Sequence, residues 1–295
     1  EWAKKQGVKV VNVPVGFKEI ANIMKKVELK LKNTPQNEVI IDDVLGNSIN
    51  LGVNPRLLFG GEESGGMIMG TEELIKSEAG RFAIAIREKS ATEAIIVASA
   101  LISKLQRKQV SLSEYLTEIF NENNIIGRFD TRVDIAYYNE SEPDINKLKE
   151  DKAAGEAKRT KNDLFYLSMA IAVKEGKMTI ENVKEVLNNT FKSLNFDNLV
   201  SIKFVGDGTY LEFTDKYIEI RPSGTDAKTK AYGGGLNKAV IETYANVLGN
   251  YSGDLNDFHK KYVSEELYKS TTDEAMKYYL NFVDKDANNE PFVIP

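Results

Sequence analysis

The residues whose side chains are best suited to bind a ligand lie together in the segment Arg221-Pro-Ser-Gly-Thr-Asp226. Arg221 presents a planar fork of N–H donors that matches phosphate or carboxylate oxygens, and Ser223 and Thr225 add hydroxyl donors at alternate positions. Gly224 permits a positive φ, with which successive backbone N–H groups can face one concavity. The pattern predicts an anion-binding bend, although a polar hairpin tip that binds nothing fits these residues equally well.

Strands are expected on both sides of this bend. Tyr217 to Ile220 alternate apolar and polar residues as a half-buried strand does, and residues 227–232 can resume an extended run. Lys228 and Lys230 are spaced by two on the second strand, so their ammonium groups are expected on one face beside the bend.

A second candidate site is the acidic, glycine-rich segment Gly60-Gly-Glu-Glu-Ser-Gly-Gly66. Glycine pairs on each side give the backbone room to approach a ligand, and Glu62 and Ser64 would point the same way in an extended loop. A carboxylate can accept hydrogen bonds from adjacent sugar hydroxyls, and a serine hydroxyl can donate or accept. A solvated acidic turn is the alternative reading of these residues.

Two basic residues, Arg87 and Lys89, precede a predicted helix that opens with the capping box Ser90-Ala-Thr-Glu93. They would add positive charge beside the acidic loop if both side chains point toward it, but solvated surface bases are the commoner outcome. The helix is expected to bury most of its apolar residues, including Ile95, Ile102 and Leu105. A second capping box, Ser111-Leu-Ser-Glu114, predicts the next helix.

Composition argues against several classes of function. A net charge of -5 argues against nonspecific binding to nucleic acid, which needs clustered Lys and Arg. The absence of Cys and the single His259 leave no disulfide framework, thiolate or His-based metal site, or His-based triad, so no metal site is predicted. No apolar run approaches the roughly 18 residues that span a bilayer, and no secretory signal opens the chain. The interpretation is a cytoplasmic protein without membrane contact.

Two domains with a connector are expected. Residues 1–138 are predicted to form an α/β domain with αβα layers, with a strand over Val8 to Val13, a helix after Gly16 and an excursion from Asn33 to Pro55. Its opening resembles the last turn of a helix, so we expect a piece of a longer protein, truncated at the N-terminus of this domain. Residues 139–195 are expected to be a charged connector with helices, the second capped by Thr179. Residues 196–295 are predicted to form an α+β domain, an antiparallel meander of four strands covered by helices on one face, with Thr271 capping a late helix.

Two loops, in order along the chain, resemble one protein family. Arg221-Pro-Ser-Gly-Thr, followed by an acidic residue and a Lys-x-Lys strand, resembles the phosphate-binding loop of the α-D-phosphohexomutases, the family of phosphoglucomutase and phosphomannomutase. Gly61-Glu-Glu-Ser-Gly65 resembles the sugar-recognition loop of the same family. The resemblance implies three α/β domains built alike and a fourth with a small antiparallel sheet. This chain resembles the third domain, without its first strand, and all of the fourth.

The resemblance also implies roles for single residues. Those that would contact the sugar are Glu62, Ser64 and Lys89. Those that would grip the nonreacting phosphate are Arg221, Ser223, Gly224 and Thr225, with Lys230 as a helper.

The resemblance implies an isomerase that interconverts hexose 1-phosphate and hexose 6-phosphate by phosphotransfer, with phosphoglucomutase favoured over phosphomannomutase. The family transfers phosphate through a phosphoserine in a Ser-His-Asn-Pro loop and holds Mg²⁺ with an Asp-x-Asp-x-Asp-Arg loop, and neither sequence occurs here. This half is therefore expected to bind hexose phosphate without turnover and to contain no catalytic residue and no bound cofactor. The full-length enzyme would use Mg²⁺ and a hexose bisphosphate activator, and the missing N-terminal domains would be its partners.

The alternative is a stand-alone, non-catalytic phosphosugar-binding module. The coding sequence upstream of Glu1 would distinguish the two, because only the enzyme needs a serine loop and an Asp-rich loop there.

Overall fold

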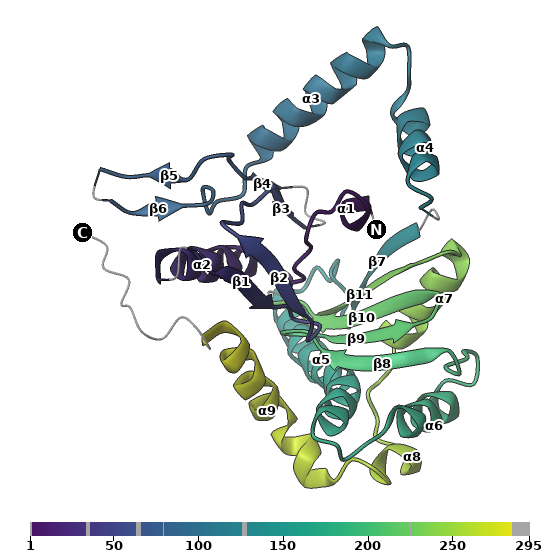
Figure 1. The fold of residues 1–295 in the computed structure, drawn as a ribbon. Helices are drawn as coiled ribbons and strands as arrows, with labels where there is room; N and C mark the ends of the chain where they lie inside the picture. The colour runs from purple at the N-terminus through teal and green to yellow at the C-terminus, as the bar shows by residue number, and fades with distance from the viewer. Residues whose placement is uncertain are drawn as a thin grey trace. The chain divides into compact units, whose positions relative to one another are not determined.

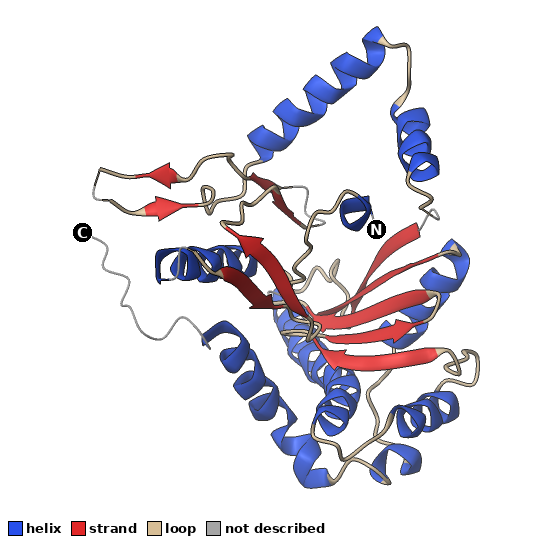
Figure 2. Cartoon of the chain, viewed as in Figure 1, coloured by secondary structure: helices blue, strands red, loops and turns tan. Residues whose placement is uncertain are grey.

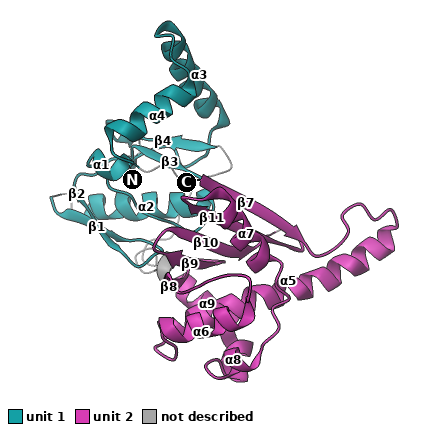
Figure 3. Ribbon diagram, turned by 90° about the vertical axis from the view of Figure 1, so that its right-hand side faces the viewer, with its two compact units in different colours: residues 1–126, 282–295 teal, residues 127–281 magenta. Residues whose placement is uncertain are grey.

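A computed structural model describes residues 2–33, 36–62, 66–78, 80–125, 129–224 and 226–284. The chain divides into two compact units, residues 1–126 with 282–295 (unit 1) and Gly127–Asn281 (unit 2), coloured separately in Figure 3. The boundary differs from the expected one at residue 138. Strand β7 (Phe129–Ala136) belongs to unit 2, because all of its residues pair with strand β11 (Lys228–Gly235).

Unit 2 contains a five-stranded antiparallel sheet with strand order β7-β11-β10-β9-β8 (Figure 1). The other strands are β8 (Leu199–Phe204), β9 (Thr209–Phe213) and β10 (Lys216–Pro222). The four strands β8 to β11 form the predicted meander, and β7 adds a strand to its β11 edge.

One face of this sheet is covered by helices. Helices α5 (Ile145–Lys174) and α7 (Lys238–Gly249) both contact the sheet, and residues of both join Leu211, Ile218 and Ile220 in one buried core. The remaining described helices are α6 (Ile180–Thr190), α8 (Asp257–Lys260) and α9 (Glu265–Asp284). The opposite face carries tyrosine and charged side chains that are only partly buried, such as Tyr210, Glu219 and Arg221. Helices on a single face agree with the prediction.

The expected connector at residues 139–195 is instead part of the core of unit 2. Helix α5 begins after the N-cap Asp144, runs for 30 residues, and buries Phe165, Tyr166 and Met169 completely. Thr179 caps α6, as predicted. Thr271 is not a cap: it lies inside α9, where its buried hydroxyl donates to the carbonyl of Leu267 at 2.6 Å.

Unit 1 is built from helices and short hairpins, which Figure 2 shows in blue and red. Its helices are α1 (Trp2–Lys5), α2 (Phe17–Asn33), α3 (Ala91–Arg107) and α4 (Leu112–Glu122). Its hairpins pair β1 (Glu38–Asp42) with β2 (Ser48–Val53), β3 (Phe59–Gly61) with β4 (Met67–Met69), and β5 (Ile75–Lys76) with β6 (Phe82–Ala83). The expected excursion from Asn33 to Pro55 thus contains the β1–β2 hairpin.

The predicted strand over Val8 to Val13 is wrong. A strand needs a neighbouring edge to satisfy its backbone, and the pairing among the described residues of unit 1 is confined to three antiparallel hairpins and one isolated bridge, none of which includes residues 8–13. Residues 8–13 instead line an apolar cavity of about 830 Å³, together with α2 and residues 55–61. The α/β character of this unit is present, whereas a layered sheet is not formed by the residues that the structure describes.

The caps of α3 and α4 were predicted correctly, and the burial of α3 was not. Ser90 accepts from the Glu93 N–H at 3.0 Å, and Ser111 forms a reciprocal capping box with Glu114. Of the apolar residues of α3, however, only Leu105 is buried, and Ile95 is 65% exposed. The main packing partners of α3 are β4 and α4, so the residues of unit 1 that the structure describes leave most of its apolar face uncovered. None of the described helices is long and apolar enough to cross a membrane.

Candidate functional site

The segment from Arg221 to Lys228 is a hairpin tip between two long paired strands. Strand β10 ends at Pro222 and β11 begins at Lys228, and the Ser223 N–H donates to the Lys228 carbonyl at 2.9 Å. The bend predicted from the sequence is therefore formed. We call residues 223–227 the tip; Thr225 lies outside the described residues.

Arg221 is held by a carboxylate from the neighbouring turn. Its Nε donates to Asp207 Oδ1 at 3.1 Å and its Nη2 to Asp207 Oδ2 at 2.6 Å. Burial disfavours the charged guanidinium, but the hydrogen bonds and charge of Asp207 outweigh burial, and the pKa of Arg221 is raised. Asp207 binds the edge of the guanidinium fork that contains Nε and Nη2, and the Tyr232 side chain also forms a hydrogen bond with Arg221.

The two lysines beside the tip have different roles. Lys230 is directly opposite Arg221 in the β10–β11 register, so both side chains lie on the face of the sheet that the helices leave open. Lys228 lies on the same face, where it forms ion pairs with Glu140 and with Asp226. Lys230 forms no ion pair with any residue that the structure describes. Lys228 therefore supports the tip, and of these two lysines Lys230 is the one that no described carboxylate pairs with.

Gly224 differs from the expectation drawn from its type. Its φ is not positive, so the tip does not use glycine for a left-handed conformation. A Cβ built on Gly224 would meet no atom within 4 Å, which means that the space beside it is open. Ser223 is only 6% exposed and is thus the least accessible of the described phosphate candidates that carry a side chain.

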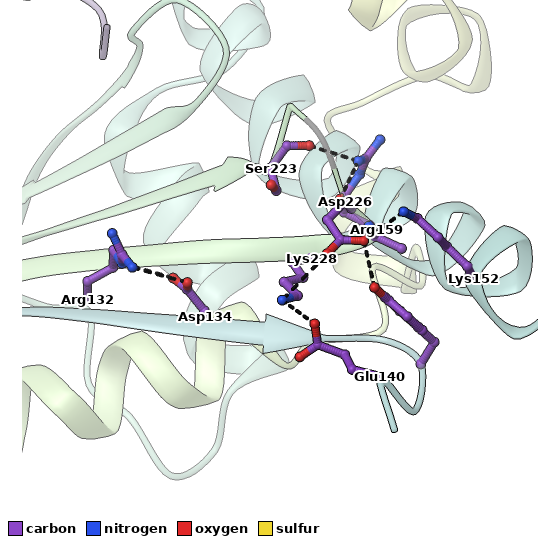
Figure 4. A network of polar contacts seen from close by, with 10 residues as sticks. Arg132, Asp134, Glu140, Lys152, Arg159, Ser223, Asp226 and Lys228 are labelled. Carbon is purple, nitrogen blue, oxygen red and sulfur yellow. Dashed lines mark hydrogen bonds and ion pairs between the residues drawn. The ribbon is translucent and has the colours of Figure 1, made fainter. Parts of the chain in front are cut away.

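Asp226 ties the tip to the rest of unit 2. Its Oδ1 accepts from the Tyr138 hydroxyl at 2.7 Å and lies 2.9 Å from Lys152 Nζ (Figure 4). The hydrogen bond from Tyr138 and the bond and charge of Lys152 lower the pKa of Asp226. This carboxylate is a structural anchor of the tip.

The acidic loop of unit 1 is the tip of a much shorter hairpin. Strands β3 and β4 pair through only Phe59↔Met69, Gly60↔Ile68 and Gly61↔Met67, and Glu62 follows directly. Glu62 is partly buried, and Ser64 lies outside the described residues. An isolated bridge between Met67 and Ser90 connects the hairpin to the start of α3.

Lys89 lies beside this loop and Arg87 does not. The exposed Lys89 ammonium is 5.3 Å from the centre of the Phe17 ring, and a Cβ on Gly66 would come within 3.2 Å of the Lys89 Cδ. Arg87 is committed to an ion pair with the buried Glu28 of α2, and burial lowers the pKa of Arg87. Of the two bases, only Lys89 is placed to meet a ligand at the acidic loop.

The residues of α5 that reach the tip were not predicted from the sequence. Arg159 donates from Nη1 to the carbonyls of both Ser223 and Asp226 at 3.0 Å, and Lys152 contacts the Asp226 carboxylate. A signal was present, since Lys152, Arg159 and Tyr166 recur every seven residues and so lie on one side of a helix.

Among the described residues, no three His, Asp or Glu side chains gather in a way that could hold a metal ion. The magnesium that the resemblance implies therefore does not fit the residues described.

Comparisons with known proteins give one informative match. Among curated proteins there is no match. Among solved structures, the di-domain ARO/CYC BexL from the BE-7585A biosynthetic pathway aligns at 10% identity over 96% of this chain and 98% of its own, with a TM-score of 0.15 that carries no conclusion about fold. Residues 1–122, which include Glu62 and Lys89, match the family described as phosphoglucomutase/phosphomannomutase, alpha/beta/alpha domain III. Over these residues, the chain is similar to the phosphoglucomutase/phosphomannomutase family.

Proposed function

We propose that this chain is the substrate-binding half of a phosphohexomutase, which interconverts hexose 1-phosphate and hexose 6-phosphate. The acidic loop would hold the sugar hydroxyls and the tip in unit 2 would hold the phosphate that is not reacting. The observation that carries the proposal is the placement of Arg221 and Lys230 opposite each other, next to open space at Gly224. The family match over residues 1–122 supports the sugar half of the proposal.

The tip has the chemistry that a phosphate dianion needs. Arg221 would donate from the edge that Asp207 leaves unused, and Lys230 would add a second positive charge. Asp207 fixes the guanidinium before a ligand arrives, so less side-chain entropy is lost on binding. The absence of a side chain at Gly224 lets the phosphate approach the backbone.

The acidic loop would recognise the sugar. The Glu62 carboxylate can accept from two neighbouring hydroxyls, Ser64 can donate or accept, and Lys89 can donate to a hydroxyl or to the phosphate. Two orientations of the substrate are needed in such a cycle, because the phosphate moves between two ends of the hexose. These loops would serve both orientations, since they read the features common to both.

The reaction itself needs groups that this chain does not contain. A phosphoserine nucleophile and Mg²⁺ would be supplied by other domains of the same protein, and the ion would neutralise charge on the transferred phosphoryl group. This half would therefore bind hexose phosphates without turning them over.

Isothermal titration calorimetry with glucose 1-phosphate tests the proposal. Arg221→Ala should weaken binding by roughly 10-fold or more, since a hydrogen bond to a charged group contributes about 1.5–3 kcal/mol. Lys203→Ala is the matched control, because Lys203 pairs with Glu212 on the same sheet but on the far edge strand β8. Unchanged affinity in Arg221→Ala, or equal losses in both variants, would show that the tip is not the phosphate site.

A further inference from the structure

We infer that Arg159 is a positioning residue for phosphate binding, because it fixes the direction of the Ser223–Gly224 peptide so that the Gly224 N–H can face the anion. This inference rests on the proposed function and deepens it. Arg159 itself would not touch the ligand. It acts from α5, a part of the chain outside both recognised loops.

The contacts of Arg159 bracket the centre of the tip. Its Nη1 donates to the Ser223 carbonyl and to the Asp226 carbonyl, each at 3.0 Å (Figure 4). In the sequence these two residues flank Gly224 and Thr225. One guanidinium nitrogen therefore holds both ends of the segment that would meet phosphate. The Asp226 side chain adds the bonds from Tyr138 and Lys152, so the tip is anchored from its inner side.

Because the peptide unit is planar, the direction of the Ser223 carbonyl also fixes the direction of the Gly224 N–H. No described peptide bond is cis, and in a trans peptide the C=O and the following N–H point in opposite directions. Because the Ser223 carbonyl points to Arg159, the Gly224 N–H must point away from α5. Helix α5 covers the face of the sheet opposite to Arg221 and Lys230. A flipped peptide would instead present a carbonyl oxygen to the phosphate, which repels it.

The charge of Arg159 is only loosely compensated. The nearest carboxylate, Asp163, lies one helical turn further along α5, with 3.9 Å between Arg159 Nε and Asp163 Oδ2. Arg159 Nε and Asp163 Oδ1 are both buried without a hydrogen-bond partner among the described residues. The positive charge beneath the tip is thus available to favour an anion on its outer side.

Another residue of α5 provides a matched control. In Asn162, too, one side-chain nitrogen donates to two backbone carbonyls, but of a different loop: Nδ2 donates to the Leu248 carbonyl at 3.0 Å and to the Tyr251 carbonyl at 2.8 Å. Asn162→Ala also removes a side-chain donor from two carbonyls, and these carbonyls lie outside the tip. In each variant one carbonyl keeps a second donor: Leu248 keeps the Tyr166 hydroxyl, and Asp226 keeps the Lys228 N–H. A general loss of stability should therefore be common to Asn162→Ala and Arg159→Ala, whereas a loss of phosphate binding should be specific to Arg159→Ala.

The experiment is a titration of the whole chain with inorganic phosphate and, separately, with glucose 1-phosphate. Binding is monitored by ¹⁵N-resolved NMR and by calorimetry. In the unmodified chain the Gly224 amide resonance should shift on addition of either ligand. Arg159→Ala should abolish most of that shift and weaken binding about tenfold. Asn162→Ala should retain both the shift and the affinity. Arg159→Lys, which keeps the charge but not the fork, should recover part of the affinity.

The outcomes separate this inference from the proposed function. If the unmodified chain binds neither ligand, the proposed function fails and the inference fails with it. If the unmodified chain binds and folded Arg159→Ala shows the same affinity and the same Gly224 shift, only the inference is overturned. Equal losses in Arg159→Ala and Asn162→Ala would also overturn it, since they would indicate a merely structural role. Should Arg159→Ala fail to fold, Arg159→Lys is judged by the same two criteria: weaker binding with a smaller Gly224 shift supports the inference, and no change in either refutes it.

Discussion

The two candidate loops are both hairpin tips, but the chain holds them in different ways. The tip in unit 2 connects two long strands inside a five-stranded sheet, and Arg159 and Lys152 support it from α5. The acidic loop in unit 1 connects two strands of three residues each, which pair with each other and are joined to the start of α3 by the bridge between Met67 and Ser90. The comparison teaches that the phosphate half of the proposed site is held by more extensive strand pairing and side-chain contacts than the sugar half.

One arginine ion pair in unit 1 and one in unit 2 also differ, in how far the carboxylate partner is exposed. Arg87 pairs with Glu28, whose side chain is 6% exposed, and Arg221 pairs with Asp207, whose side chain is 47% exposed. A buried carboxylate that loses its partner has no water to replace it, whereas an exposed one does. The pair in unit 1 should therefore serve stability, and the pair in unit 2 should serve binding.

The largest expected effect is the difference in stability lost when the arginine of each ion pair is replaced. Arg87→Ala should destabilise unit 1 by about 3 kcal/mol, because it leaves the buried Glu28 unpaired. Urea unfolding followed by the fluorescence of Trp2, the single tryptophan, reports on unit 1. Arg221→Ala should cost unit 2 about 1 kcal/mol or less in unfolding followed by circular dichroism. Similar losses in both variants would remove the distinction.

Two glycines of unit 2 should respond differently when each is replaced by alanine. A Cβ on Gly208 would lie 2.8 Å from the Arg221 Cβ and 3.0 Å from the Ile220 carbonyl oxygen, so Gly208→Ala should cost roughly 1–3 kcal/mol. Gly224→Ala should change stability by less than about 0.5 kcal/mol, because its methyl group enters open space. The same methyl should weaken phosphate binding, since it occupies the place of the ligand. Strong destabilisation by Gly224→Ala would contradict the geometry of the tip.

A pH effect should separate the two units. Burial raises the pKa of Asp163 to about 8, so folded unit 2 holds a proton there that the unfolded chain releases near its ordinary value. The stability of unit 2 should therefore decrease as pH rises toward 8. Burial lowers the pKa of His259 to about 4, which acts in the opposite direction below about 6.5, so the window from about 6.5 to 8 isolates Asp163.

Thermal unfolding of unit 2, measured across that window, checks this prediction. Asp163→Asn should flatten the dependence, because asparagine remains neutral at every pH. The Trp2 signal of unit 1 should show no matching slope, since Asp43 and Glu114 have lowered pKa values and titrate well below this window. A slope that survives in Asp163→Asn would assign the effect to another group.

The smallest expected effect compares one helix cap in each unit. Ser111 and Thr179 each form a capping box, and replacement of either by Ala should cost about 1 kcal/mol of helix stability. Helix α6 buries Val183, Val186 and Leu187, so Thr179→Ala should lower the stability of unit 2 as a whole. Helix α4 buries none of its residues, so Ser111→Ala should only increase local amide exchange. Global destabilisation by Ser111→Ala would mean that α4 is coupled to the core.

Local patterns in the sequence were sufficient for the meander and for most of the caps. Strands β8 to β11 alternate in polarity and end at turn residues, and the caps at Ser90, Ser111 and Thr179 depend only on neighbouring residues. Strand β7 was missed although Val133 and Ile135 alternate with charged residues, because its partner β11 lies about ninety residues further along the chain. Pairing over such a separation cannot be read from local pattern.

The other errors concern tertiary contacts. The first half of α5 is so charged that it indicated a connector, yet Lys152 and Arg159 are the residues that hold the tip. The apolar face of α3 indicated burial, but an apolar pattern says nothing of what covers it. Within the candidate site, the sequence was sufficient to predict which residues lie beside each loop. It was not sufficient to predict the separate roles of Lys228, Lys230 and Arg87, because those roles depend on where the partner carboxylates lie in space.

The central claim is that the two loops bind one hexose phosphate, and one NMR titration tests it most directly. Glucose 1-phosphate is added to the ¹⁵N-labelled chain, and the amide resonances of Glu62 and Arg221 are followed together. The account predicts that both shift along one saturation curve with a single Kd, and that free glucose or phosphate alone binds more weakly. A shift at only one of the two residues, or two curves with different midpoints, would contradict it.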